Sequence, residues 1–348
     1  MGRHNAVQLK YIHTYRDRHG RKRYYFRRRG KNTALPGLPG SREFMDAYAV
    51  CLGNSDSAPR LTRELSPTPR SFNALAIAYF SSANYRALAP GSQSIYRRTL
   101  EPFLEEHGHR RADQMKREHV IALIGDMADR PGAANMLLKR LRTLLHFGMD
   151  LGWIKEDPTA RVKSYRSKEL HTWTEQEIAT FEARWHKGSK QRLAFALLLY
   201  TGQRGSDVRK MVWTDMVGAT IRVAQQKTGT KLVLPLHPDL QALLATAPRK
   251  QATILATEYG AAFSPKGFGN FLSGAIRCAG LPALCKAHGL RKAAARRLAD
   301  AGCTTKQIAA ITGHRSLAEV ERYTRAADQE RLAQEAVAKL RGGRTERE

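Results

Sequence analysis

Two polar stretches without apolar periodicity divide the chain. Residues 53–70 (GNSDSAPRLTRELSPTPR) collect Ser, Pro, Asn and charged residues, and residues 160–173 (ARVKSYRSKELHTW) are basic and poor in apolar side chains. Neither stretch can supply a helix face or a strand face to a core, so both are predicted to be linkers. The 348 residues also exceed the size at which one core is usual. We therefore expect separate domains over residues 1–52, 71–160 and 172–341.

The first segment has the pattern of a small, basic β-sheet. Residues 11–35 alternate aromatic or β-branched residues with cations and are interrupted by two glycine-containing turns. This pattern predicts three strands joined as hairpins. A solvated basic tail is the alternative, because runs of charge are usually exposed. The aromatic residues of the stretch argue against a tail.

The other two segments are mainly helical. Helical spacing and Pro or Gly punctuation predict four or five helices over residues 71–160. In the third segment we expect an apolar helix over 192–202, a strand, turn and strand over 220–236, and a helix over 288–302. The predicted fold class is multidomain. An α-helical domain is followed by a mixed α+β domain that is mostly α with a small antiparallel sheet.

The net charge indicates a polyanionic partner. Lys and Arg number 59 against 31 Asp and Glu, a formal net charge of +28, and nucleic acid is the leading candidate for such a surface. No run approaches the roughly 20 apolar residues of a spanning helix, and the N-terminus lacks the core of a signal peptide, so we expect a cytoplasmic protein with no membrane partner. The four cysteines form no Cys-x-x-Cys pair, so neither a disulfide framework nor a zinc site is predicted.

Several cations of the first two segments are candidate phosphate contacts. Those of the helical segment fall on the polar sides of predicted helices, where a solvated surface is an equally good reading of each one alone. The predicted DNA-binding residues are Arg27, Arg28, Arg97, Arg98, Lys139, Arg140 and Arg142.

The stretch TGHRSLAEVERYT, residues 312–324, combines a histidine and a tyrosine around a helix start. Gly313 is predicted to end one helix, and Ser316 with Glu319 forms a capping-box pattern for the next. His314 would then lie in a helix–helix corner, and Tyr323 about two turns into the second helix. A phenol with an ordinary pKa of about 10 attacks a phosphodiester only where cations stabilise the phenolate or a base removes the proton.

Further groups suited to holding a phosphate lie upstream. His288 and Arg291 stand three residues apart at a helix start, so they can address one anion together. Arg204 stands in a glycine-containing turn just before a helix, for which Ser206 is the predicted N-cap. Each residue taken alone is more often a surface side chain than a catalytic one.

Together these residues resemble the signature of the tyrosine recombinase (phage integrase) family. His288, Arg291, His314 and Tyr323 match its His-x-x-Arg, Gly-His and Tyr elements, and the Thr-Gly-x-Arg box is present with Arg204. The family's catalytic lysine lies on a hairpin turn. Lys227, followed by Thr228 and Gly229, fits that pattern better than Lys231, its rival. By the same resemblance Asp207 is the acidic residue that supports the site.

The resemblance implies an activity and an organisation. It implies a site-specific DNA recombinase that cleaves and rejoins strands through a 3′-phosphotyrosyl intermediate at Tyr323, integrating or excising a phage or other mobile element. Segment by segment it implies an arm-binding-like sheet, a helical core-binding domain and a catalytic domain. The implied partners are double-stranded DNA, three further copies in a homotetramer, and accessory DNA-bending or excision factors in a bacterial cell. No metal or other cofactor is implied.

Three alternatives remain open at this point. A type IB topoisomerase uses a similar residue set, and a non-catalytic DNA-binding regulator could retain the fold. An RNA-binding protein would rest only on the charge and aromatic residues of the first segment.

Overall fold

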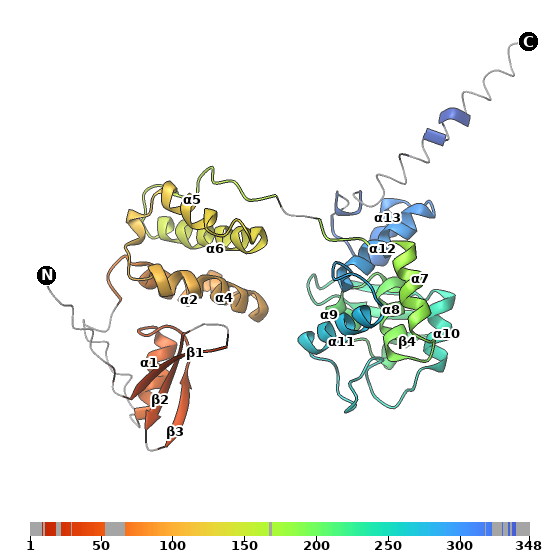
Figure 1. Cartoon of the computed structure of the whole chain (residues 1–348), viewed down its shortest axis with the longest axis horizontal. Coiled ribbons are helices and arrows are strands. Elements are labelled where there is room, and N and C mark those ends of the chain that lie inside the picture. Colours follow the sequence, from red (N-terminus) through yellow and green to blue (C-terminus); the bar gives the residue numbers. More distant parts are fainter. Residues whose placement is uncertain are drawn as a thin grey trace, which may run out of the picture. The chain divides into compact units, whose positions relative to one another are not determined.

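The computed structural model describes residues 9, 11–18, 22–28, 30–52, 67–166, 169–316 and 318–321, with residues 329, 333–334 and 336–338 beyond them. The chain divides into two compact units, Met1–Lys168 and Glu169–Glu348 (Figure 1). Helices predominate and both sheets are small and antiparallel, so the predicted fold class is confirmed. None of the helices in the described ranges has the length and apolarity that a bilayer crossing requires.

Unit 1 begins with the predicted three-stranded sheet. Strands β1 (Ile12–Arg16), β2 (Lys22–Arg28) and β3 (Lys31–Leu35) pair antiparallel, with β2 in the centre and Tyr24 opposite both Thr14 and Leu35. The sheet buries Phe26 against a helix that the sequence pattern did not predict, α1 (Arg42–Leu52), whose Phe44 and Tyr48 complete a small core. This packing rules out the basic-tail alternative for the described residues.

The rest of unit 1 is a helical bundle. Its helices are α2 (Phe72–Ser81), α3 (Ala83–Arg86), α4 (Pro90–His107), α5 (Arg117–Gly125) and α6 (Pro131–Asp150), within the predicted number. Ser71 and Ser82 cap α2 and α3, and Pro90 and Pro131 stand at the first turns of α4 and α6, where a missing N–H leaves no helical bond unmade. The bundle core is dominated by the leucines of α6.

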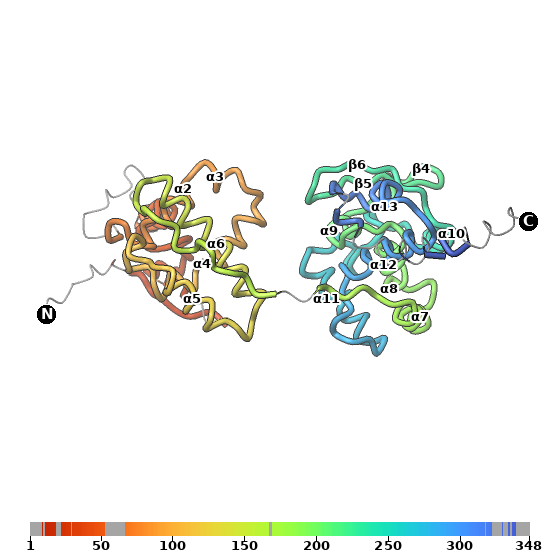
Figure 2. The backbone as a smooth tube through the Cα atoms, turned by 90° about the horizontal axis from the view of Figure 1, so that it is seen from above, coloured from red at the N-terminus to blue at the C-terminus, as the bar shows by residue number. Residues whose placement is uncertain are grey.

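Unit 2 packs helices around one central helix. In chain order its helices are α7 (Glu175–Arg184), α8 (Lys190–Thr201), α9 (Gly205–Val208), α10 (Pro238–Thr246), α11 (Pro265–Cys278), α12 (Ala287–Asp300) and α13 (Thr305–Thr312). Strands β4 (Met216–Val217), β5 (Thr220–Ala224) and β6 (Lys231–Pro235) form its sheet. Figure 2 shows this sheet along one edge of unit 2 and α7 along the opposite edge.

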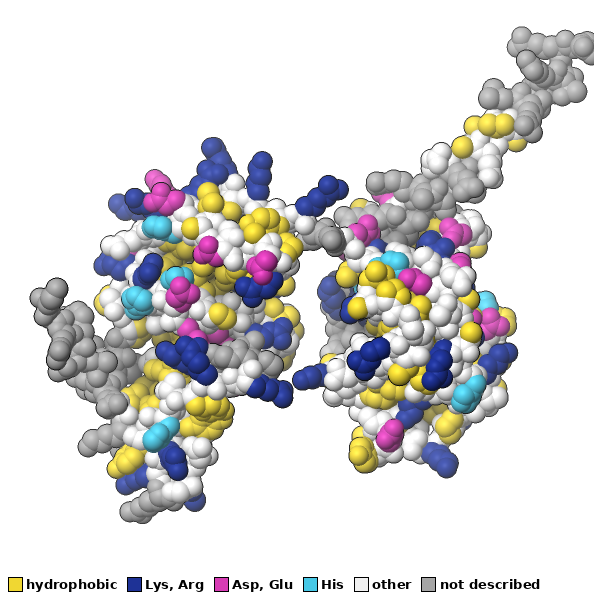
Figure 3. All heavy atoms as spheres, in the orientation of Figure 1, with side chains coloured by type: hydrophobic (Ala, Val, Ile, Leu, Met, Phe, Trp, Pro, Cys, Tyr) yellow, Lys and Arg dark blue, Asp and Glu magenta, His cyan; other side chains and the backbone are white. Residues whose placement is uncertain are grey.

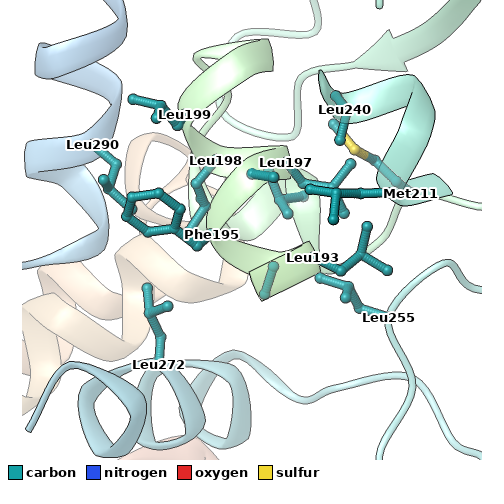
Figure 4. Close-up of a cluster of buried hydrophobic side chains, with 14 of the residues drawn as sticks. Leu193, Phe195, Leu197, Leu198, Leu199, Met211, Leu240, Leu255, Leu272 and Leu290 are labelled. Carbon is teal, nitrogen blue, oxygen red and sulfur yellow. The ribbon is translucent and has the colours of Figure 1, made fainter. Parts of the chain in front are cut away.

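Helix α8 is apolar on all sides because it is the centre of this core. Phe195, Leu197 and Leu198 are fully buried, and Leu193 and Leu199 nearly so (Figure 4). The helix packs against α9, α10, α11 and α12. A helix with no polar face is fixed in position by its neighbours. The residues that follow its last turn are therefore held firmly.

Candidate active site

Arg204 follows directly from the end of the central helix. Gly202 ends α8 in the left-handed conformation, with φ +62°, and Arg204 is itself the N-cap of α9. The prediction that Ser206 caps this helix was wrong, because Ser206 lies inside the short α9 and its hydroxyl points to Asp207. Arg204 Nη1 donates to Gln225 Oε1 at 3.1 Å. The guanidinium is thus held by the β5 end of the hairpin.

Arg291 is the buried centre of the site. Helix α12 begins at Ala287, so His288 and Arg291 lie in its first turns as predicted. The Arg291 side chain is 1% exposed, and its Nη1 donates to Gly202 O at 2.8 Å and to Thr312 O at 2.6 Å. Both carbonyls lie at a helix end, where they lack intrahelical partners. Arg291 therefore ties α12 to the ends of α8 and α13.

His314 follows the C-terminus of α13, where Gly313 has φ +70° as the predicted helix stop requires. His314 Nδ1 lies 2.7 Å from Thr312 Oγ1, and that hydroxyl already donates to Ile308 O. The proton between them must therefore belong to Nδ1, which leaves Nε2 of the neutral ring as an acceptor. Burial, and then the charges of Arg291, Arg204 and His288, lower the pKa of His314 to about 4.

His288 experiences the same positive field. Partial burial lowers the pKa of His288 most, followed by the charges of Arg291, Arg204, Lys292 and Lys227, although the residue as a whole is exposed. The ring is therefore neutral at physiological pH and can accept a proton. These interactions also show that three of the predicted residues, Arg204, Lys227 and Arg291, lie within electrostatic range of His288.

Lys227 occupies the turn between β5 and β6 and is exposed. Lys231, the rival, is the first residue of β6 and is also exposed. A lysine on a turn has more freedom to reach a substrate atom than one whose backbone belongs to a strand ladder. The preference for Lys227 stays a prediction.

Asp207 is buried beneath the hairpin. Its Oδ1 accepts hydrogen bonds from the backbone N–H of Gln226 at 2.9 Å and from Ser206 Oγ at 3.3 Å. Among the described residues, Oδ2 is buried without a hydrogen-bond partner. The carboxylate thus braces the hairpin against α9 rather than facing a substrate directly.

Sequence reasoning missed a pair of buried glutamines. Gln203 Nε2 donates to Ile311 O at 2.8 Å and Gln225 Nε2 to Thr312 O at 2.8 Å, and the two side chains are joined at 2.7 Å. Each stands one or two positions from a predicted catalytic residue in the sequence. Their types gave no signal, because a glutamine in a turn is usually a surface residue.

The predicted nucleophile cannot be placed. Tyr323 lies among residues 322–328, outside the described residues. The helix expected around it is described over 318–321, where Val320 is fully buried against α12 and α13 residues.

The predicted DNA-binding cations divide into two groups. Arg27, Arg28, Arg98 and Lys139 are exposed. The remaining three make contacts within unit 1. Arg97 bonds Glu43 at 2.6 and 3.2 Å, Arg140 stacks 3.9 Å over the ring of Tyr96, and Arg142 donates to Thr159 and Val162 carbonyls at 3.3 Å. Lys139 and Arg142 also line a hollow of about 630 Å³. Figure 3 shows exposed Lys and Arg side chains on the visible faces of both units.

One cluster of potential metal ligands lies where unit 2 begins. Ligand atoms of His171, Glu177 and Cys285 are within 4.8 Å of one another. Glu177 already accepts from His171 at 2.7 Å and from the Thr174 backbone in a capping box. Burial and Glu177 raise the pKa of the Cys285 thiol to about 12, so the thiolate that a metal needs is disfavoured. The three residues act as a hydrogen-bonded clasp between α7 and the loop before α12.

Comparison with known proteins finds a family match for unit 2. Residues 172–330 match the model of the phage integrase family. The integrase of Escherichia phage HK022 is 33% identical over 99 residues, which is 26% of this chain and 28% of that protein, so the match spans less than a third of this relative.

Two solved structures share the fold of this chain. A lambda integrase dimer bound to a COC′ core site aligns with a TM-score of 0.65 at 20% identity, over 91% of this chain and 95% of that one. A lambda integrase tetramer bound to a Holliday junction aligns with a TM-score of 0.64 at 19% identity, over 89% and 94% of the two chains.

Proposed function

We propose that this chain is a member of the phage integrase family and a site-specific DNA recombinase that integrates or excises a mobile element. The observation that carries the proposal is the joining of Arg204, Arg291 and His314 by one hydrogen-bond network, although they come from three separate segments. Two guanidinium groups and two histidines in a common field suit a pentavalent phosphate, on which negative charge accumulates.

In the proposed reaction, the phenolic oxygen of Tyr323 attacks the scissile phosphorus. The bond to the 5′-oxygen breaks, leaving a 3′-phosphotyrosyl link and a free 5′-hydroxyl. Lys227 donates the proton that this leaving oxygen needs, and neutral His288 helps to remove the phenol proton. Attack by the 5′-hydroxyl of another strand reverses the sequence and releases the tyrosine, so no external energy source is consumed.

Arg204 and Arg291 would hold the two non-bridging oxygens. His314 would add a third donor through Nε2, which requires a protonated ring because Nδ1–H is committed to Thr312. An approaching phosphate favours that protonation by its own negative charge. Substrate binding would thus supply the charge state in which His314 works.

The proposed partners are double-stranded DNA and further copies of the chain. The lambda integrase solved on a Holliday junction is a tetramer, and strand exchange between two duplexes needs four active sites. A tetramer on DNA, with accessory DNA-bending or excision factors, is therefore expected here. The three domains, 1–52, 71–160 and 172–341, would serve as arm-binding, core-binding and catalytic parts.

Tyr323→Phe tests the proposal. The variant should form no covalent adduct with a nicked suicide substrate, while its affinity for intact DNA stays close to that of the unchanged protein, because only one hydroxyl is lost. Denaturing gels measure the adduct and gel shifts measure the affinity. Adduct formation by the variant would show that the nucleophile is another residue. Relaxation of supercoils without any strand exchange between duplexes would favour a type IB topoisomerase instead.

A further inference from the structure

Gln225 makes four side-chain hydrogen bonds from a fully enclosed position, at 1% exposure. Its Oε1 accepts from Arg204 Nη1 at 3.1 Å and from Thr228 Oγ1 at 2.7 Å. Its Nε2 donates to Gln203 Oε1 at 2.7 Å and to Thr312 O at 2.8 Å. The amide thus uses two lone pairs and two protons, which is its whole hydrogen-bonding capacity.

The backbone of the same residue closes the turn that carries Lys227. The Gln225 N–H donates to Thr230 O at 2.9 Å, and the Gln225 carbonyl accepts from Gly229 N–H at 2.8 Å. Gly229 permits this with φ +69°. Thr228, within the turn, is bonded to the Gln225 side chain as well. Lys227 therefore sits in a loop whose base is one anchored residue.

The third connection leads to the second arginine. Thr312 O accepts from both Gln225 Nε2 and Arg291 Nη1, at 2.8 and 2.6 Å. The next residue must be small, because a Cβ at Gly313 would lie 2.4 Å from Gln225 Nε2. The amide is packed directly against the turn that positions His314.

We propose that Gln225 is a positioning residue that sets the Lys227 turn in register with the two arginines. The inference rests on the roles of Arg204 and Lys227 in the proposed function. The arginines fix the phosphate, and the amide fixes the base of the turn relative to them, so the ammonium reaches the leaving 5′-oxygen. Misplacing a reacting group by about 1 Å can lower a rate by about 10²-fold.

The test separates proton delivery from every other function of the residue. Gln225→Met keeps the size of the side chain and removes its hydrogen bonds. Gln226→Met makes the same change at the adjacent glutamine, whose side chain is exposed. Single-turnover cleavage is measured on ordinary DNA and on DNA with sulfur replacing the 5′-bridging oxygen. A thiolate leaves without a proton, so the sulfur substrate does not need Lys227.

We expect Gln225→Met to cleave ordinary DNA about 10- to 100-fold more slowly, with most of the loss recovered on the sulfur substrate. Gln226→Met should match the unchanged protein on both. Equal losses of Gln225→Met on the two substrates would overturn the inference, since the amide would then serve the arginines or the fold alone. Full activity of Gln225→Met on ordinary DNA would also overturn the inference.

The variant Lys227→Ala distinguishes a failure of the inference about Gln225 from a failure of the proposed role of Lys227. If sulfur does not rescue Lys227→Ala, Lys227 is not the proton donor and the inference fails with that assignment. If Gln225→Met does not fold, Thr228→Val removes the contact between the turn and Gln225 Oε1, together with a bond within the turn that Thr230 Oγ1 donates to the Thr228 hydroxyl. Recovery of that variant on the sulfur substrate supports the inference, and an equal loss on both substrates, or no loss, overturns it.

Discussion

At the scale of single residues, protonation of His314 makes the free energy of unfolding depend on pH. Its pKa in the folded chain is about 4, below the ordinary 6.5, so between these values the unfolded chain binds more protons than the folded one. The free energy of unfolding should therefore fall as the pH drops from 6.5 towards 4. Urea unfolding at a series of pH values should show a flatter dependence for His314→Gln. His109→Gln, at an exposed histidine, is the control and should keep the original slope.

Arg142 and Lys139 allow a structural cation to be distinguished from one proposed to contact DNA. The Arg142 guanidinium bonds Thr159 Oγ1 and two backbone carbonyls, whereas Lys139 is exposed on the same helix. Arg142→Lys keeps the charge but cannot reproduce these bonds, so unfolding free energy should fall by about 1–3 kcal/mol. Lys139→Ala should weaken DNA binding and leave stability within about 0.5 kcal/mol. Thermal unfolding measures the stability of the two variants and gel shifts measure their DNA affinity. The reverse pattern would contradict the roles given to Arg142 and Lys139.

At the scale of elements, the start of α12 depends on a close approach. A Cβ at Gly289 would lie 2.6 Å from the His171 carbonyl and 2.7 Å from the Trp173 ring, while Trp173 Nε1 donates to Lys286 O. Gly289→Ala should push the first turn of α12 away, moving His288 and Arg291 together. We expect a cleavage loss on the order of 10²-fold, measured on suicide DNA. Gly274→Ala, which has open space in α11, should cleave normally.

The elements that sequence reasoning predicted are those with a local signal. The hairpin of β5 and β6, the apolar α8 and the α13 stop at Gly313 each follow from periodicity or from one glycine. Helix α1 and strand β4 were missed because their patterns are short and weak. The Gln203 and Gln225 pair could not be found either, since the bonds that join the two residues to each other and to the end of α13 span about 20 to 110 positions.

At the scale of the whole molecule, the charge predicts steeply salt-dependent binding. Each phosphate neutralised on duplex DNA contributes about 0.9 to the slope of log K against log salt. Arg98→Ala with Lys139→Ala should reduce the slope by about 1.8 if each side chain contacts one phosphate. Affinity measured across a salt series gives the slope. An unchanged slope would place the DNA elsewhere on the surface.

The last carbonyls of α13 accept hydrogen bonds from the side chains of Gln203, Gln225 and Arg291. Fraying of this terminus would loosen Arg291, the Gln225 side chain that holds Arg204, and His314 at the same time. Deuterium uptake at the C-terminus of α13 should therefore report whether the hydrogen bonds that hold the proposed catalytic residues are formed. A compound that binds at this helix end and breaks these hydrogen bonds should inhibit the protein without competing with DNA for its binding surface.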